Sequence, residues 1–165
     1  MRPGSNRAFT AIEMLAALGL MAIVAAGASL SLAGIQRRSD MAGAIDRIKF
    51  FDDLTRRQAI QSGRPLTLTF DETAINRAAM PATPGDPPIA MLQLPDGFTI
   101  DRTVVFATDQ TTVPISAAGL SPTYAVLLSG RGQRRWMIVS AVGAATMADD
   151  DGVVEDEMDR LQTPR

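Results

Sequence analysis

Hydrophobic residues dominate the first quarter of the chain. From Met14 to Gln36 there are 23 residues without a charge. A helix needs about 20 such residues to cross the hydrocarbon core of a membrane, so the run predicts a transmembrane helix. Arg2 and Arg7 precede the run, and the larger part of the chain follows it. The positive-inside tendency therefore favours a cytoplasmic N-terminus and an exported domain.

An amphipathic pattern follows the apolar run. Apolar residues recur every three or four positions, and charged residues fall mostly on other faces, as in a helix with one buried side. The apolar positions are Met41, Ala44, Ile45, Ile48, Phe51 and Leu54, and the charged ones are Asp40, Arg47, Lys49, Asp53, Arg56 and Arg57. Gly63 and Pro65 then form a typical helix terminator. We predict that the helix continues to residue 62 and packs one side on a domain.

Beyond Gly63 the hydrophobic period changes from helical to alternating. Residues 65–70, PLTLTF, alternate apolar and polar side chains, which is typical of a half-buried strand. Residues 89–94 and 98–107 also predict strands, and residues 80–88 form a loop rich in Pro and Gly. The clearest hairpin is residues 123–142, where two apolar runs flank a turn at 130–133. A long helix followed by short strands predicts an α+β fold with the helix packed on a small antiparallel β-sheet domain.

Composition removes several kinds of chemistry. The chain has 165 residues, with no cysteine and no histidine. Disulfides, Cys/His zinc sites, thiol nucleophiles and imidazole bases are therefore excluded. Four candidate nucleophiles, Ser116, Ser121, Ser129 and Ser140, have no histidine to activate them. We expect no catalytic, cofactor-binding or metal-binding residues and no enzymatic activity.

Two basic features have ordinary explanations. Gly130-Arg131-Gly132 lacks the spacing and the following helix of a phosphate-binding loop, which favours a hairpin turn. Arg131, Arg134 and Arg135, together with Arg102, could form a basic strip for DNA. However, the net charge of the chain is -2, and no aromatic stacking platform accompanies these arginines. Solvated hairpin arginines are the stronger interpretation, and we do not expect nucleic acid as a partner.

Two features of the last third are aromatic or acidic. Trp136 lies on a predicted strand, and we expect it in the core. The segment from Asp149 to Asp159 holds seven carboxylates, and their spacing does not match an EF-hand loop. We predict a solvated, flexible acidic tail, with an acidic docking surface for partner subunits as the alternative.

Glu13 needs an explanation, because a carboxylate within a membrane helix costs about 2.5–3.5 kcal/mol and usually has a partner. A cleaved secretory signal with its cut near Ala26 is one alternative, but such apolar regions are typically about 7–15 residues long. A plain membrane anchor leaves Glu13 unexplained, and the remaining chain is too small to bury the run as a core helix. If the chain were cut before Phe9, Glu13 would be residue five, one helical turn from a new amino group.

The motif Arg-Ala-Phe-Thr-Ala-Ile-Glu-Met-Leu at residues 7–15, followed by the apolar run, resembles the leader of type IV pilins and type II secretion pseudopilins. The resemblance implies that prepilin peptidase cuts between Ala8 and Phe9 and methylates Phe9. It also implies that Glu13 compensates the N-terminal charge of an adjacent subunit in a fibre. Ala8 departs from the family, which nearly always has glycine before the cut.

Two later segments resemble one branch of that family. Residues 50–71 are similar to the helix end and first strand of the H-type minor pseudopilins (GspH/FimT-type), and residues 115–143 are similar to their closing region. The resemblance implies a pilin-like fold and a minor pseudopilin of a type II secretion pseudopilus. The alternatives are a type IV minor pilin, for adhesion or DNA uptake, and a membrane-anchored exported domain that binds a ligand. Implied partners are prepilin peptidase, other pseudopilins or pilins, inner-membrane lipid and secreted substrates.

These expectations divide the chain into five segments and place it in a bacterial inner membrane. The N-terminus would be cytoplasmic and the domain periplasmic until the subunit is extracted into a fibre. The segments are a leader at 1–8, a transmembrane and assembly helix at 9–36, an amphipathic helix at 37–62, a β-rich domain at 63–147 and an acidic tail at 148–165.

Overall fold

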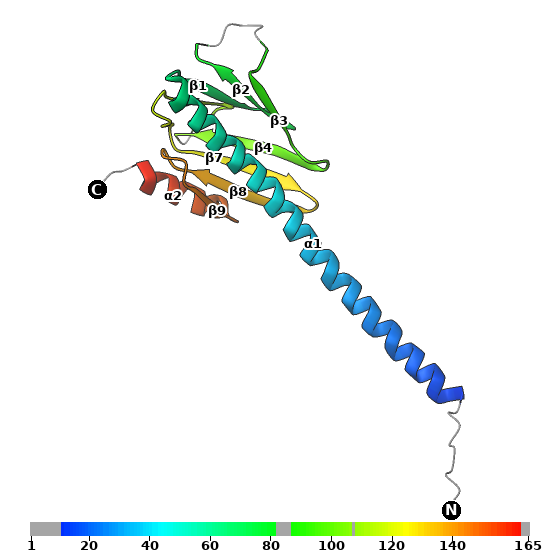
Figure 1. The fold of residues 1–165 in the computed structure, drawn as a ribbon. Helices are drawn as coiled ribbons and strands as arrows, with labels where there is room; N and C mark the ends of the chain where they lie inside the picture. The colour runs from blue at the N-terminus through cyan, green and yellow to red at the C-terminus, as the bar shows by residue number, and fades with distance from the viewer. Residues whose placement is uncertain (1–10, 82–86, 107, 163–165) are drawn as a thin grey trace, which may run out of the picture. The chain divides into compact units, whose positions relative to one another are not determined.

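A computed structural model describes residues 11–81, 87–106 and 108–162 of the chain (Figure 1). Within the helices it leaves out the side chains of residues 13, 26–38, 159, 161 and 162. The chain divides into two compact units, Met1–Ser39 and Asp40–Arg165, which we treat separately. One helix, α1 (Ala11–Ser62), contributes to both units.

The predicted helix end is confirmed. Helix α1 stops at Ser62, and Gly63 follows with a φ of 65° and donates its N–H to Ile60 O at 3.3 Å. Glycine adopts this left-handed conformation without the steric cost that other residues have, and Pro65 cannot continue the helix. The sequence therefore ends the helix by local chemistry alone.

In the described part of the chain, nine strands follow α1 and form two antiparallel sheets. The first sheet has the order β3-β2-β1-β6 and the second the order β5-β4-β7-β8-β9. The bounds are β1 (Leu66–Phe70), β2 (Ala74–Ala79), β3 (Ala90–Gln93), β4 (Phe98–Val105), β5 (Thr108–Asp109), β6 (Thr112–Ile115), β7 (Tyr124–Gly130), β8 (Gln133–Val139) and β9 (Ala145–Ala148). The prediction of an α+β fold with a helix on antiparallel strands is confirmed, with two sheets in place of one.

The predicted hairpin of residues 123–142 is also confirmed. Strands β7 and β8 pair from Tyr124↔Val139 to Gly130↔Gln133. At the turn, Arg131 and Gly132 have φ values of 51° and 77°, as a two-residue hairpin turn of type I′ requires. The motif at 130–132 is therefore a hairpin turn.

The second sheet is buried on both faces. Alternate residues of β7 and β8 point to opposite sides, as strand geometry demands. Tyr124, Val126 and Leu128 belong to the core that contains the buried side chains of α1, such as Ile48. Leu127 and Trp136 belong to a second core, so the prediction of a core position for Trp136 is confirmed.

The second core is completed by a helix where we expected a flexible tail. Helix α2 (Asp151–Gln162) packs Val154 and Met158 against β7, β8 and β9. Its first turn is capped, since Asp150 Oδ1 accepts the N–H of Gly152 at 2.9 Å. The prediction of a flexible tail was wrong for these residues. It relied on the many carboxylates and overlooked Val154 and Met158, two apolar residues at i and i+4 that lie on one face of a helix.

The predicted faces of α1 need two corrections. Leu54, which we expected on the buried face, is 39% exposed. Arg56, which we expected at the surface, is 5% exposed and lies among the core residues. The prediction assigned charged residues to the surface because of their polarity. Arg56 lies four residues after Asp52 and three before Ala59, so helix geometry places all three on the same buried face.

Candidate functional site

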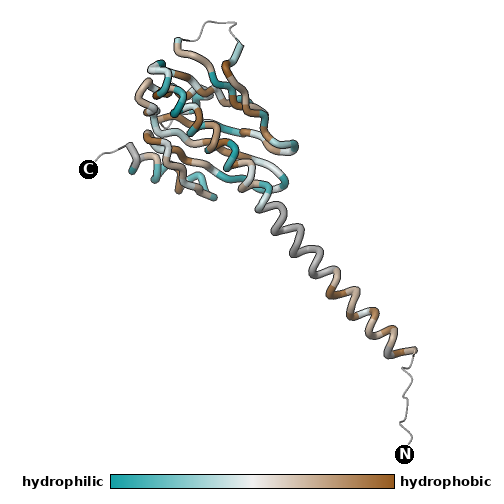
Figure 2. The backbone as a smooth tube through the Cα atoms, in the orientation of Figure 1, coloured by the Kyte–Doolittle hydropathy of each residue, from teal (hydrophilic) through white to brown (hydrophobic). Residues whose placement is uncertain are grey.

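Apolar residues make up most of the N-terminal turns of α1, which are largely brown in Figure 2. Steps of 100° per residue distribute these side chains around the whole helix axis. Eight large apolar side chains are between 58% and 75% exposed: Ile12, Met14, Leu15, Leu18, Leu20, Met21, Ile23 and Val24. A helix that is hydrophobic all round is normally covered by protein or by lipid. This segment is therefore a surface that needs a cover.

The residues predicted for processing and assembly lie at or before the start of α1. Ala8 and Phe9 fall outside the described residues, and Glu13 lies on α1, where its backbone is described and its side chain is not. Among the described residues, no helix combines the length and the hydropathy that a membrane crossing needs. The predicted crossing at 9–36 extends beyond those residues, so these assignments stay predictions.

Inside the domain, a buried ion pair anchors the end of α1. Arg56 Nε lies 2.6 Å from Asp52 Oδ2, one helical turn earlier. The hydroxyl of Tyr124, on β7, donates to the other oxygen of Asp52 at 2.8 Å. All three residues are at most 5% exposed. The carboxylate is thus satisfied on both oxygens, as burial of a charge requires.

The guanidinium of Arg56 reaches two loops of the domain. Its Nη1 donates to Gly119 O at 2.9 Å and to Ala141 O at 2.8 Å. Its Nη2 donates to the hydroxyl of Ser121 at 2.7 Å, and that hydroxyl donates to Pro122 O at 2.9 Å. We call Asp52, Arg56, Ser121 and Tyr124, with the two carbonyls, the buried network. It joins α1 to the segments after β6 and after β8.

The two loops that meet Arg56 have the same construction. Each begins with a serine whose hydroxyl accepts the backbone N–H four residues later at 3.1 Å, in Ser116–Leu120 and Ser140–Ala144. Each places a glycine with positive φ at its fourth position: Gly119 at 76° and Gly143 at 92°. A Cβ on Gly143 would lie 3.0 Å from the Arg56 side chain, so the loop approaches the guanidinium as closely as its backbone allows.

Burial sets the electrostatics of Tyr124. Loss of solvation raises the pKa of its hydroxyl well above the usual value, and the negative charge of Asp52 adds to this shift. The hydroxyl therefore stays protonated at neutral pH and remains a donor to the carboxylate. The network is a closed set of donors and acceptors that links parts of the fold, and it presents no open face to a substrate.

The arginines considered for DNA binding each face a carboxylate. Exposed pairs of this kind contribute little stability, but they cancel local positive charge. The pairs are Arg102–Asp109 at 2.6 Å, Arg131–Asp40 at 2.7 Å, Arg134–Asp101 at 3.6 Å and Arg135–Asp149 at 3.1 Å. The interpretation as solvated, paired hairpin residues agrees with this arrangement.

The buried network is the feature that sequence reasoning missed. Two signals pointed to it: an Asp and an Arg at i and i+4 on the apolar side of the helix, and the repeated tetrapeptide Ser-Ala-x-Gly at 116–119 and 140–143. Of the four candidate serines, two start these loops and Ser121 belongs to the network. Ser129 donates to Asp101 on the neighbouring strand.

The chain is similar to known proteins in structure and not in sequence. No protein-family model matches the chain, and no curated sequence matches it significantly. The type IV minor pilin FimU of Pseudomonas aeruginosa is similar in structure with a TM-score of 0.51 at 12% identity, over 68% of this chain and 90% of that one. The minor pseudopilin EpsH of the Vibrio cholerae type 2 secretion system aligns with a TM-score of 0.48 at 12% identity, over 66% and 95%. The FimU likeness confirms the prediction of a pilin-like fold.

Proposed function

We propose that the chain is a structural subunit of a pilin-like fibre and that its N-terminal helix joins it to neighbouring subunits. The observation that carries this proposal is the helix surface of residues 11–25, where large apolar side chains face outward on all sides. Such a surface is stable when other helices or lipid cover it. A domain with the fold of a minor pilin follows that helix in the same chain.

Assembly would begin with processing at the inner membrane. Prepilin peptidase would cut between Ala8 and Phe9 and methylate the new terminus, as the leader motif implies. Glu13 would then face the amino group of a neighbouring subunit in an apolar surrounding. Opposite charges attract more strongly there than in water, and an unpaired carboxylate is costly. The pairing would therefore fix the axial position of each subunit.

The fibre is proposed to be a type II secretion pseudopilus, with the chain as a minor pseudopilin. The support is the similarity of residues 50–71 and 115–143 to the H-type minor pseudopilins. The likeness to FimU favours a second candidate, a minor pilin of a type IV pilus. In both cases the subunit would stand in the inner membrane with its domain in the periplasm before it enters the fibre.

Substitution of Glu13 tests the assembly step. Expressed in its native host, the Glu13→Ala chain should be processed but should be absent from sheared fibres. The control, Asp46→Ala, changes an exposed carboxylate on the same helix and should be recovered as the unchanged chain is. Recovery of Glu13→Ala in fibres at the level of the control would contradict the proposed charge pairing. A chain that never enters fibres, with or without the substitution, would favour a membrane-anchored ligand-binding domain.

A further inference from the structure

A pocket of about 240 Å³ lies between α2 and the second sheet. Its apolar wall consists of Val104 from β4, Trp136 from β8, and Val154 and Met158 from α2. These four residues belong to the second core, and all are less than a tenth exposed. The helix therefore covers the sheet without filling the space next to Trp136.

Charged side chains form the rest of the pocket lining. Arg102 lines it, but this guanidinium already pairs with Asp109 at 2.6 Å. Asp151 accepts the indole N–H of Trp136 at 2.5 Å. Glu155 makes no hydrogen bond or ion pair within the described part of the chain.

The charges around the pocket leave a negative excess. Arg102 and Asp109 cancel, and Asp151 and Glu155 remain, which gives a formal charge of -2. The pKa of Arg102 is raised, first by the hydrogen bond and charge of Asp109, with Asp151 and Glu155 adding smaller contributions. An anion would be repelled from this lining, whereas a cation would find an unpaired carboxylate at Glu155.

The size of the pocket limits its occupant. Sites for free ligands usually measure about 300–1,000 Å³, so this pocket suits one side chain better than a cofactor or a drug-sized molecule. Lysine and arginine combine an aliphatic stem with a charged head. Their stems lie along apolar surface while the head stays at a polar rim. That division matches an apolar wall with carboxylates beside it.

We propose that this pocket receives a lysine or arginine side chain of a protein partner. The stem packs beside Trp136 and Met158, and the charged head pairs with Glu155 and Asp151. The exposed acidic surface of α2 extends the same complementarity to further basic residues of the partner. The occupant is a basic side chain that a second protein presents, and the apolar wall and the carboxylates of the lining argue for it independently of fibre assembly.

Trp136 offers a direct assay, because it is the one tryptophan of the chain and lines the pocket. The full-length protein in mild detergent would be titrated with an acetylated, amidated Gly-Lys-Gly-Lys-Gly peptide while tryptophan fluorescence is recorded. The comparison peptide carries norleucine in place of lysine, which keeps most of the stem and removes the charge. We expect the lysine peptide to bind about tenfold more tightly, with an affinity that falls as salt rises.

Two matched variants locate the binding. Glu155→Gln removes the unpaired carboxylate of the pocket and should weaken the lysine peptide by about fivefold. Asp156→Asn removes the same charge from the next residue of α2, outside the pocket lining, and should change the affinity by less than about twofold. Both side chains are exposed, so both variants should fold.

Three results would overturn the proposal. The first is equal binding of the two peptides, which would indicate an apolar site. The second is an equal loss in Glu155→Gln and Asp156→Asn, which would indicate diffuse attraction to an acidic helix. The third is unchanged fluorescence at a peptide concentration where binding is seen by another method, which would place the peptide away from Trp136.

Discussion

Replacement of Arg56 by methionine tests how the end of α1 is held to the domain. Methionine keeps a long flexible side chain and removes the guanidinium. The substitution would leave Asp52 buried with the hydroxyl of Tyr124 as its remaining donor. The carbonyls of Gly119 and Ala141 would each lose a donor at the same time.

The expected cost follows from these lost partners. Removing one side of a buried ion pair typically destabilises a protein by about 3–5 kcal/mol. The carbonyl of Gly119 would lose its donor, which adds about 1–3 kcal/mol unless water reaches it, whereas Ala141 O keeps the backbone N–H of Ser121 at 3.1 Å. Because these losses overlap, we expect about 3–5 kcal/mol in total, a large part of the ~5–15 kcal/mol that stabilises a typical domain.

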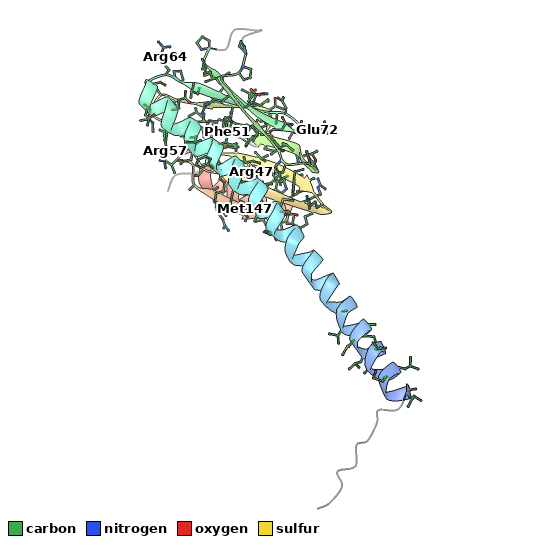
Figure 3. All side chains as sticks on the ribbon, turned by 45° about the vertical axis from the view of Figure 1, so that its right-hand side comes forward. Arg47, Phe51, Arg57, Arg64, Glu72 and Met147 are labelled. Atoms are coloured by element: carbon green, nitrogen blue, oxygen red, sulfur yellow. The ribbon has the colours of Figure 1, made fainter. Side chains whose placement is uncertain are left out.

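The matched control is the neighbouring residue. Arg57, which is labelled on α1 in Figure 3, also pairs with an aspartate one turn earlier. Its partner is Asp53 at 2.9 Å, and both side chains are more than half exposed. Arg57→Met should therefore cost about 0.5 kcal/mol or less.

Urea unfolding of the full chain in mild detergent, followed by the fluorescence of Trp136, measures both variants. With a slope of about 1.5–2 kcal/mol/M, Arg56→Met should lower the midpoint by about 2 M and Arg57→Met by less than about 0.3 M. The reasoning is refuted if the two variants lose stability equally. Double replacement with Asp52→Asn should be no less stable than Arg56→Met alone, since it removes the uncompensated charge.

Three further predictions concern other parts of the domain. The raised pKa of Tyr124 favours the folded state while the hydroxyl is protonated. The free energy of unfolding should therefore be constant up to about pH 10, the usual pKa of tyrosine, and should decrease as the pH rises toward the pKa of the folded state. Tyr124→Phe should abolish this decrease in unfolding experiments. Gly143→Ala should destabilise the protein by at least about 1 kcal/mol more than Gly132→Ala in urea unfolding. Both glycines have a positive φ, but only a Cβ at residue 143 would lie 3.0 Å from the Arg56 side chain. Equal losses of stability would contradict this close contact. Met158→Ala should destabilise by about 2–5 kcal/mol and the exposed Val153→Ala by less than 1, whereas equal small effects would mean that α2 contributes no core.

The sequence predicted well the parts of the fold that depend on local chemistry. The end of α1 follows from Gly63 and Pro65, and the main hairpin follows from two apolar runs around a Gly-containing turn. Strand β1 follows from strict alternation. Each of these signals acts within a few residues, so it can be recognised without knowledge of distant contacts.

The parts that depend on distant partners were harder to predict. Strands β5 and β9 are short, and their pairing with β4 and β8 defines them more than their own composition does. Helix α2 has a charged sequence. It is stabilised by packing on one face of the second sheet, and the sequence alone does not predict that this face is available. The division into two sheets likewise arises from long-range pairing.

The buried network illustrates the same limit. Arg56 reads as a surface residue because arginine is seldom buried without partners. Those partners, Gly119 and Ala141, lie 63 and 85 residues away and are backbone carbonyls, which no side-chain pattern reveals. The spacing of Asp52 and Arg56 and the repeated Ser-Ala-x-Gly loops were the two available signals, and the meaning of the loops depends on knowing that both meet the same helix.

The candidate assembly residues, in contrast, come from the sequence alone. Ala8, Phe9 and Glu13 were predicted from a leader motif, and their roles require a peptidase and a neighbouring subunit. The apolar surface of residues 11–25 agrees with such a role, because it needs a cover.

The intact mass and N-terminal residue of the protein recovered from membranes test the central claim most directly. The measurement compares cells with and without prepilin peptidase. The proposed function predicts a chain that begins at methylated Phe9 when the enzyme is present and at Met1 when it is absent. A start at Met1 in both cells, or a cut near Ala26, would contradict the assignment of the leader and of a fibre subunit.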